Sequence, residues 1–132
     1  MRARDTSLPR IPDRVMMDPA SRIPLNPRDY LILFSLVEED RHGYGIVKHV
    51  EGGSRGGVRL DPANLYRSLK RMTDEGLVEE TDAPPGDDPA ADRRKYYRVT
   101  RLGRAVVELE ARRLAELTDA ARALELLSGE ST

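Results

Sequence analysis

The forty residues from 61 to 100 constrain the fold of this chain more than any other segment. They open with Asp61 and Pro62, a helix start in which aspartate caps free N–H groups and proline takes the first helical position. Gly76 predicts the end of that helix. Two short strands and a polar loop with three prolines follow, expected at Leu77–Thr81, Lys95–Val99 and Ala83–Asp92. The centre of the predicted fold is therefore a helix followed directly by a hairpin.

The preceding segment predicts two further helices. Asn26 and Pro27 repeat the capped start. The apolar residues of the first helix are expected to form one buried stripe, Tyr30, Leu31, Leu33, Phe34 and Val37. Residues 38–40 then predict a solvated acidic end, and residues 42–45 a turn. The second helix is short, and its buried side is expected to be Ile46, Val47 and Val50. A short strand is predicted at residues 58–60.

The last segment predicts a long helix that starts after Thr100 and runs from Arg101 to about Leu127. Gly103 in its first turn costs about 1 kcal/mol relative to alanine, which suggests close packing there. About 27 residues of helix span roughly 40 Å, more than a small core covers. A second copy of the chain is expected to cover the remaining apolar stripe, and the candidate dimer contacts are Val106, Leu109, Leu117 and Leu124.

These elements predict a mainly α fold with a small β-wing, an α+β arrangement of one domain with an added arm. We expect a flexible arm over residues 1–24 and a helical and hairpin domain over 25–100. The C-terminal helix should occupy 101–128, followed by a tail at 129–132. No internal repeat is evident.

Composition excludes several classes of function. The absence of cysteine excludes disulfides and thiolate metal sites and fits a cytoplasmic protein. No apolar run reaches the roughly 18–20 residues of a membrane span, and the N-terminus lacks the apolar region of a signal peptide. The two histidines, His42 and His49, form no metal motif, and no nucleophile–base or phosphate-loop pattern occurs. We therefore expect neither a catalytic residue, nor a cofactor, nor a metal.

The charge pattern suggests DNA as a partner, although the net formal charge is only −1. The outward face of the central helix presents Asn64, Arg67, Lys70 and Arg71, which have the donors that bases and phosphates accept. The second strand begins Arg-Lys-Tyr-Tyr-Arg, with Tyr97 and Val99 expected on one face and Tyr96 and Arg98 on the other. Because the loop before it is acidic, we expect phosphate contacts at the base of the hairpin, from Arg93, Arg94 and Lys95.

Together these motifs resemble the PadR family of bacterial transcriptional regulators. The matching segments lie between about residues 25 and 105, namely residues 31–36, 42–46, 64–72, 75–78, 94–100 and Gly103. The resemblance implies a winged helix-turn-helix homodimer whose third helix enters the DNA major groove. It adds Tyr66 and Tyr96 to the expected DNA contacts. It also implies a repressor that binds a palindromic operator and is released by a small hydrophobic or phenolic effector.

A second hypothesis is a winged-helix protein-interaction module without specific DNA binding. The acidic stretch between Asp74 and Asp92 and the near-neutral total charge favour it. For an effector pocket, Tyr30 and Phe34 are candidates, although ordinary core packing explains both residues better.

Overall fold

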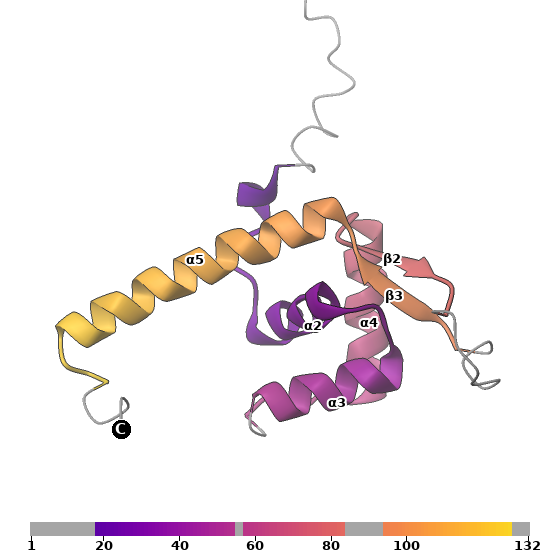
Figure 1. Cartoon of the computed structure of the whole chain (residues 1–132), viewed down its shortest axis with the longest axis horizontal. Helices are drawn as coiled ribbons and strands as arrows, with labels where there is room; N and C mark the ends of the chain where they lie inside the picture. Colours follow the sequence, from indigo (N-terminus) through magenta and orange to yellow (C-terminus); the bar gives the residue numbers. More distant parts are fainter. Residues whose placement is uncertain (1–17, 55–56, 84–93, 128–132) are drawn as a thin grey trace, which may run out of the picture.

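The computed structural model describes residues 18–54, 57–83 and 94–127. Three helices form a compact group beside a small sheet, and a long helix crosses over them (Figure 1). The elements in chain order are η2 (Pro19–Arg22), α2 (Pro27–Glu38), β1 (Arg41–His42), α3 (Gly43–Gly53), α4 (Pro62–Asp74), β2 (Val78–Thr81), β3 (Tyr96–Val99) and α5 (Arg101–Ala123). None of the described helices is long and apolar enough to cross a membrane.

The helix starts predicted from capping residues are confirmed. Asn26 Oδ1 accepts the Asp29 N–H at 2.8 Å, and Asp61 Oδ1 accepts the Asn64 N–H at 2.8 Å. Thr100 Oγ1 accepts the Gly103 N–H at 3.0 Å. Each cap satisfies a donor that the first helical turn leaves free, so three helix positions follow from local sequence alone.

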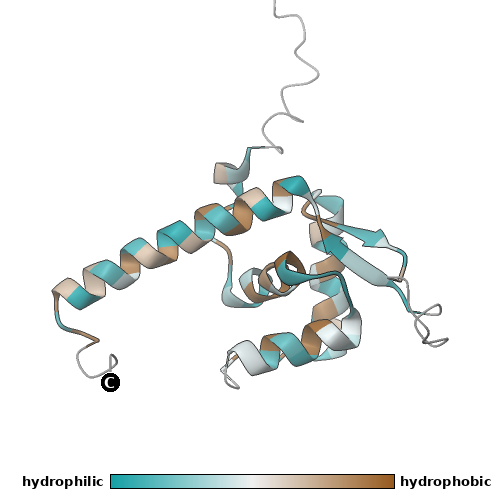
Figure 2. Cartoon of the chain, in the orientation of Figure 1, coloured by the Kyte–Doolittle hydropathy of each residue, from teal (hydrophilic) through white to brown (hydrophobic). Residues whose placement is uncertain are grey.

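The core lies where α2, α3 and α4 meet the sheet and the first turns of α5. Figure 2 shows the apolar residues of these helices turned toward one another. The stripe predicted for α2 is partly wrong, because the buried apolar residues of this helix are Ile32, Leu33 and Leu36, whereas Phe34 is 46% exposed. The helix packs against both α3 and α5, so its buried face is rotated from the expected one.

The sheet has the order β1-β3-β2, with both pairs antiparallel. The strand predicted at residues 58–60 is wrong, since the third strand is Arg41–His42, paired with Tyr97 and Tyr96. Val58 instead lies in a bend before α4, where its N–H donates to Ser54 Oγ at 3.0 Å. The turn predicted at 42–45 is also wrong, because α3 begins there at Gly43.

Tyr96 and Tyr97 are both buried, although adjacent residues of β3 point to opposite faces, as predicted. Tyr96 is 9% and Tyr97 5% exposed, whereas Arg98, on the same face as Tyr96, is exposed. The Tyr96 ring meets the His42 ring edge-on, with centroids 5.3 Å apart. β1 and the start of α3 therefore cover the side of the hairpin that a two-stranded wing would leave open.

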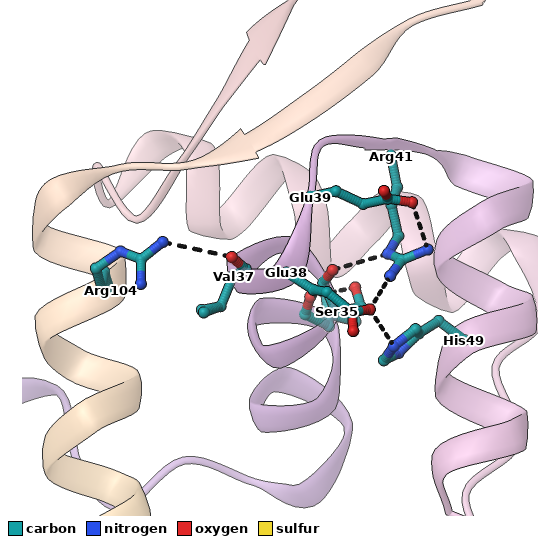
Figure 3. A network of polar contacts seen from close by, with 8 residues as sticks. Ser35, Val37, Glu38, Glu39, Arg41, His49 and Arg104 are labelled. Atoms are coloured by element: carbon teal, nitrogen blue, oxygen red, sulfur yellow. Dashed lines mark hydrogen bonds and ion pairs between the residues drawn. The ribbon is translucent and has the colours of Figure 1, made fainter. Parts of the chain in front are cut away.

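The acidic residues Glu38 and Glu39 at the end of α2 are exposed to solvent, as predicted, and they also form ion pairs with Arg41. Figure 3 shows Arg41 among them, with its Nε donating to the Ser35 carbonyl at 2.8 Å and its Nη2 to Glu38 Oε1 at 2.6 Å. Arg104 of α5 donates to the Val37 carbonyl at 3.4 Å. Two arginines from different elements thus satisfy carbonyls that the helix end leaves free, which fixes β1 and α5 against α2.

The first half of α5 packs on the domain and the second half does not. Val106, Val107 and Glu110 are buried, and Glu110 Oε2 accepts the Leu25 N–H at 2.9 Å. From residue 111 onward no described residue of α5 is buried. Segment 18–24, assigned from sequence to the arm, contains η2, which packs on α5; residues 1–17 lie outside the described part.

The helix α5 ends at Ala123, four residues before the expected Leu127. Glu125 adopts a left-handed φ of 61°, and the Leu126 N–H bonds the Ala121 carbonyl at 2.9 Å. This hydrogen-bond pattern is that of a helix stop usually made with glycine. Since glutamate occupies the left-handed position here, the sequence carried no signal of the stop.

Candidate nucleic-acid interface

The outward face of α4 lies opposite a fully packed inner face. Leu65, Ser68, Leu69 and Met72 are buried, as predicted for the three apolar residues among them. Asn64 is half-buried, and the exposed residues of the outer face include Tyr66, Arg67 and Lys70. The helix is therefore held from behind while its polar side chains stay accessible.

The polar side chains in the first turns of α4 are ordered by one another. Asn64 Nδ2 donates to Asp61 Oδ2 at 3.0 Å, and Arg67 Nη2 donates to Asn64 Oδ1 at 2.6 Å. These two hydrogen bonds orient the guanidinium of Arg67 and the amide of Asn64 before any ligand binds. Arginine and asparagine are the residues that pair most readily with guanine and adenine edges, and a preset orientation lowers the entropic cost of such contacts.

Arg71 differs from the other basic residues of α4. Its Nη2 donates to Asp29 Oδ2 at 2.7 Å, and its Nη1 lies 3.8 Å from Glu75 Oε1. The side chain of Asp29 is only 5% exposed. The sequence assigns Arg71 to the candidate DNA face; in the structure its side chain is 45% exposed and also pairs with the buried carboxylate of Asp29 on α2.

The Tyr66 side chain is 51% exposed and lies over the start of α3. A Cβ atom added to Gly43 would stand 2.6 Å from its hydroxyl oxygen, so the ring occupies space that only glycine leaves free. Tyr66 thus joins the face of α4 to the N-terminal end of α3. This contact was not apparent from either segment alone.

Two basic residues of the hairpin, Lys95 and Arg98, are paired with acids of the same hairpin. Lys95 Nζ lies 3.7 Å from Glu80 Oε2, and Arg98 Nε lies 3.4 Å from Glu79 Oε2. Arg93 and the acidic loop, residues 84–93, lie outside the described part of the chain. The cations at the base of the hairpin are accessible, but acids accompany them.

Arg94 contacts His42, a residue that the sequence did not assign to the interface. Its Nη1 lies 3.0 Å from His42 Nε2, while His42 Nδ1 accepts the Gly45 N–H at 3.2 Å and caps α3. Burial, and secondarily the charge of Arg94, lower the pKa of His42 below its ordinary 6.5. A neutral imidazole therefore links the base of the hairpin to α3.

Tyr44 and Lys48, on the first turns of α3, were also missed by sequence reasoning. Tyr44 is 67% exposed, and Lys48 Nζ lies 5.6 Å from the centre of its ring. Tyr44 was assigned to a turn, which hid the helix face that it shares with Lys48. Both side chains lie on the same end of α3 as His42 and Tyr66.

The four candidate dimer residues divide into two groups. Val106 is fully buried inside the chain's own core, and Leu109 is half-buried. Leu117 is 54% and Leu124 is 72% exposed, and Leu126 beyond the helix is equally open at 71%. The exposed leucines of the described residues thus lie in the distal half of α5 and the turn after it.

The described residues contain no group of three histidine, aspartate or glutamate side chains placed to hold a metal ion.

A helix held by a three-helix core, with a hairpin beside it and a flanking third strand, defines a winged helix-turn-helix protein. The chain belongs to the transcriptional regulator PadR-like family, whose family model matches residues 32–109. This is a family of regulators rather than enzymes, as expected from the sequence.

Similar proteins agree with this assignment. Transcriptional regulator Rv3488 of Mycobacterium tuberculosis is 34% identical over 101 residues, which cover 76% of this chain and 82% of that protein. An uncharacterized protein X of Lysinibacillus sphaericus is 31% identical over 91 residues, covering 69% and 81%. A crystal structure of a PadR family regulator from Clostridium difficile, 25% identical, superposes with a TM-score of 0.62 over 75% of this chain and 98% of that one.

Proposed function

We propose that the chain is a homodimeric repressor that binds an inverted repeat in a bacterial promoter and acts in the cytoplasm. The observation that carries the proposal is the pair of hydrogen bonds that link Asp61, Asn64 and Arg67 on the accessible face of α4. Accessible cations of the hairpin lie beside this face. Base contacts would come from Asn64 and Arg67. Phosphate contacts would come from Lys70, Lys95 and Arg94, which position the protein without reading sequence.

The proposed dimer forms through the distal half of α5. Leu117 on α5 and Leu124 directly after its end expose apolar side chains where the helix leaves the domain, and a two-fold pair of such helices would bury both. Two α4 helices related by that axis would meet half-sites about one turn of DNA apart, which is why the operator is proposed to be palindromic. Val106 would support the helix from inside the domain.

An effector is the remaining part of the proposal. A small hydrophobic or phenolic molecule would find aromatic surface on α2, where the rings of Tyr30 and Phe34 lie 6.0 Å apart and Phe34 is half exposed. His49 of α3 lies beside Phe34, with ring centroids 6.1 Å apart. A polar atom next to apolar rings suits a phenolic hydroxyl.

The test begins with DNA selected from a random pool by the purified chain. Arg67→Ala should weaken binding to the selected operator by about tenfold, because one bidentate base contact contributes on the order of 1–3 kcal/mol. Leu117→Glu with Leu124→Glu should convert the dimer to a monomer in analytical ultracentrifugation. Selection of no common sequence, or unchanged operator affinity for Arg67→Ala, would reject sequence-specific binding through α4.

A protein-interaction module is the second candidate. It is favoured by the pairing of Lys95 and Arg98 with Glu80 and Glu79, which reduces the positive field of the hairpin. It predicts that the pool selection enriches no palindrome.

A further inference from the structure

A groove of about 330 Å³ separates α4 from the hairpin β2–β3. Two lysines and two acids line it: Lys70 and Asp74 belong to α4, Glu80 to β2, and Lys95 directly precedes β3. The lysines proposed to touch DNA phosphates therefore share one groove with two carboxylates.

Each lysine of the groove is matched with one of those acids. Lys70 Nζ lies 3.6 Å from Asp74 Oδ2, and Lys95 Nζ lies 3.7 Å from Glu80 Oε2. All four side chains are more than half exposed. Exposed ion pairs of this length contribute little to folding stability, so the fold does not depend on them.

The two acids affect the binding of a DNA phosphate more than they affect folding stability. A phosphate that contacts Lys95 from outside must come within a few ångströms of the Glu80 carboxylate. Repulsion over that distance is only partly screened, since the Debye length is about 8 Å at physiological salt. The charge of Glu80 is also felt inside the groove by Tyr97. Burial is the main cause that raises the pKa of Tyr97, and the negative charge of Glu80 is the second cause.

We propose that Glu80 and Asp74 are affinity-setting residues, which hold Lys95 and Lys70 in ion pairs that a DNA phosphate must break or share. Non-specific binding depends almost wholly on phosphate contacts, whereas specific binding adds base contacts. The acids weaken binding to every sequence, so that only DNA that also satisfies Asn64 and Arg67 is held. This inference rests on the proposed function, namely that α4 and the hairpin face DNA.

The experiment compares Glu80→Gln and Asp74→Asn with Glu51→Gln in the full chain. Glu51 is an exposed acid in the last turn of α3, and the C-terminal end of that helix lies away from the sheet (Figure 1). Its variant therefore loses the same charge at a remote place. Binding to a fluorescent duplex of random sequence and to the selected operator is measured by anisotropy across a series of NaCl concentrations.

We expect Glu80→Gln and Asp74→Asn each to tighten both duplexes about threefold at low salt. Each should also steepen the plot of log K against log salt by up to about 0.9, the contribution of one phosphate contact. Glu51→Gln should leave the slope unchanged. Slopes and affinities for the two groove variants that match those of Glu51→Gln would overturn the inference.

A double-mutant cycle assigns the effect to the ion pair. In a Lys95→Gln background, Glu80→Gln should no longer tighten binding or steepen the slope, because the lysine it would release is absent. A persistent effect there would overturn the pairing mechanism. If the wild-type chain binds no DNA, both the proposed function and this inference fail; if it binds and needs Arg67 while the groove variants behave like the control, only this inference fails.

Discussion

Arg71 of α4 donates to the buried carboxylate of Asp29 across 2.7 Å, and this contact joins the C-terminal half of α4 to the first turn of α2. Asn26 Nδ2 lies 3.3 Å from the same carboxylate oxygen. A buried carboxylate without its cation would be costly, so the pair holds α4 at a fixed angle to the core.

Loss of this pair should destabilise the fold rather than the DNA contact alone. Asp29→Ala and Arg71→Ala are each expected to lower the free energy of unfolding by about 2 kcal/mol, less than for a fully buried pair because Arg71 is partly exposed. Arg67→Ala, the matched control on the same helix, should change it by less than about 0.5 kcal/mol. Urea denaturation measures the free energy of unfolding of the three variants. Equal values for Arg71→Ala and Arg67→Ala would show that Arg71 has no structural role.

Gly103 should be irreplaceable even by alanine. An added Cβ would collide with the Leu77 carbonyl oxygen and stand 2.8 Å from Val99 Cγ2. Backbone cannot give way cheaply there, because the Leu77 carbonyl also accepts the Thr100 N–H at 3.0 Å. We expect Gly103→Ala to cost at least about 2 kcal/mol, despite the gain of about 1 kcal/mol in helix propensity.

The control for that substitution is Gly52→Ala in α3, where an added Cβ meets nothing within 4 Å. It should stabilise the chain by up to about 1 kcal/mol, as helix propensity alone predicts. Thermal denaturation of both variants separates packing from propensity. A stable Gly103→Ala variant would mean that α5 does not approach the sheet so closely.

The lowered pKa of His42 predicts a pH dependence of stability near neutrality. Burial and Arg94 disfavour its protonation in the folded chain, so the unfolded chain binds more protons. Stability should therefore be constant above about pH 6.5 and fall as the pH drops below that value. His42→Asn keeps a cap acceptor without a titrating ring, and its unfolding free energy should lose this slope. The same slope in both proteins would contradict the assignment.

Glu110 predicts a second loss of stability at lower pH. Hydrogen bonds from Arg113 at 2.6 and 2.7 Å, supported by the Leu25 N–H, lower the pKa of this carboxyl below its ordinary 4.5 in spite of burial. The stabilisation is present above about pH 4.5 and is lost as the pH falls below it. Glu110→Gln should be less stable at neutral pH and show a flatter acid limb in equilibrium denaturation. An unchanged acid limb would remove Glu110 from the acid transition.

Local signals predicted the elements well, because caps act within four residues. Asn26, Asp61 and Thr100 each accept from the residue three positions later, and each was predicted from its side chain alone. The strand β1 was missed, since two residues carry no alternation to detect. Its partner β3 lies more than fifty residues away in the chain, so only the assembled sheet defines it.

The helix face of the candidate interface was predicted from sequence, but the ion pairs between its basic and acidic residues were not. The outward face of α4 follows from helical periodicity. The contact of Lys95 with Glu80 depends on the register of β2 with β3, which pairs Glu80 with Tyr97. The burial of Asp29 likewise depends on how α2 meets α4. Long-range pairings of this kind leave no pattern in neighbouring residues.

In the proposed dimer, the distal half of α5 would link assembly to folding. Isolated helices shorter than about 12–15 residues are marginal in water, and the part of α5 beyond Glu110 falls in this range without packing of its own. In the proposed dimer, that half would gain its helical order only when a second chain covers it. Occupancy of the operator would then rise with the square of the protein concentration while the dimer is scarce, so a twofold change in copy number would act on the promoter as a fourfold change.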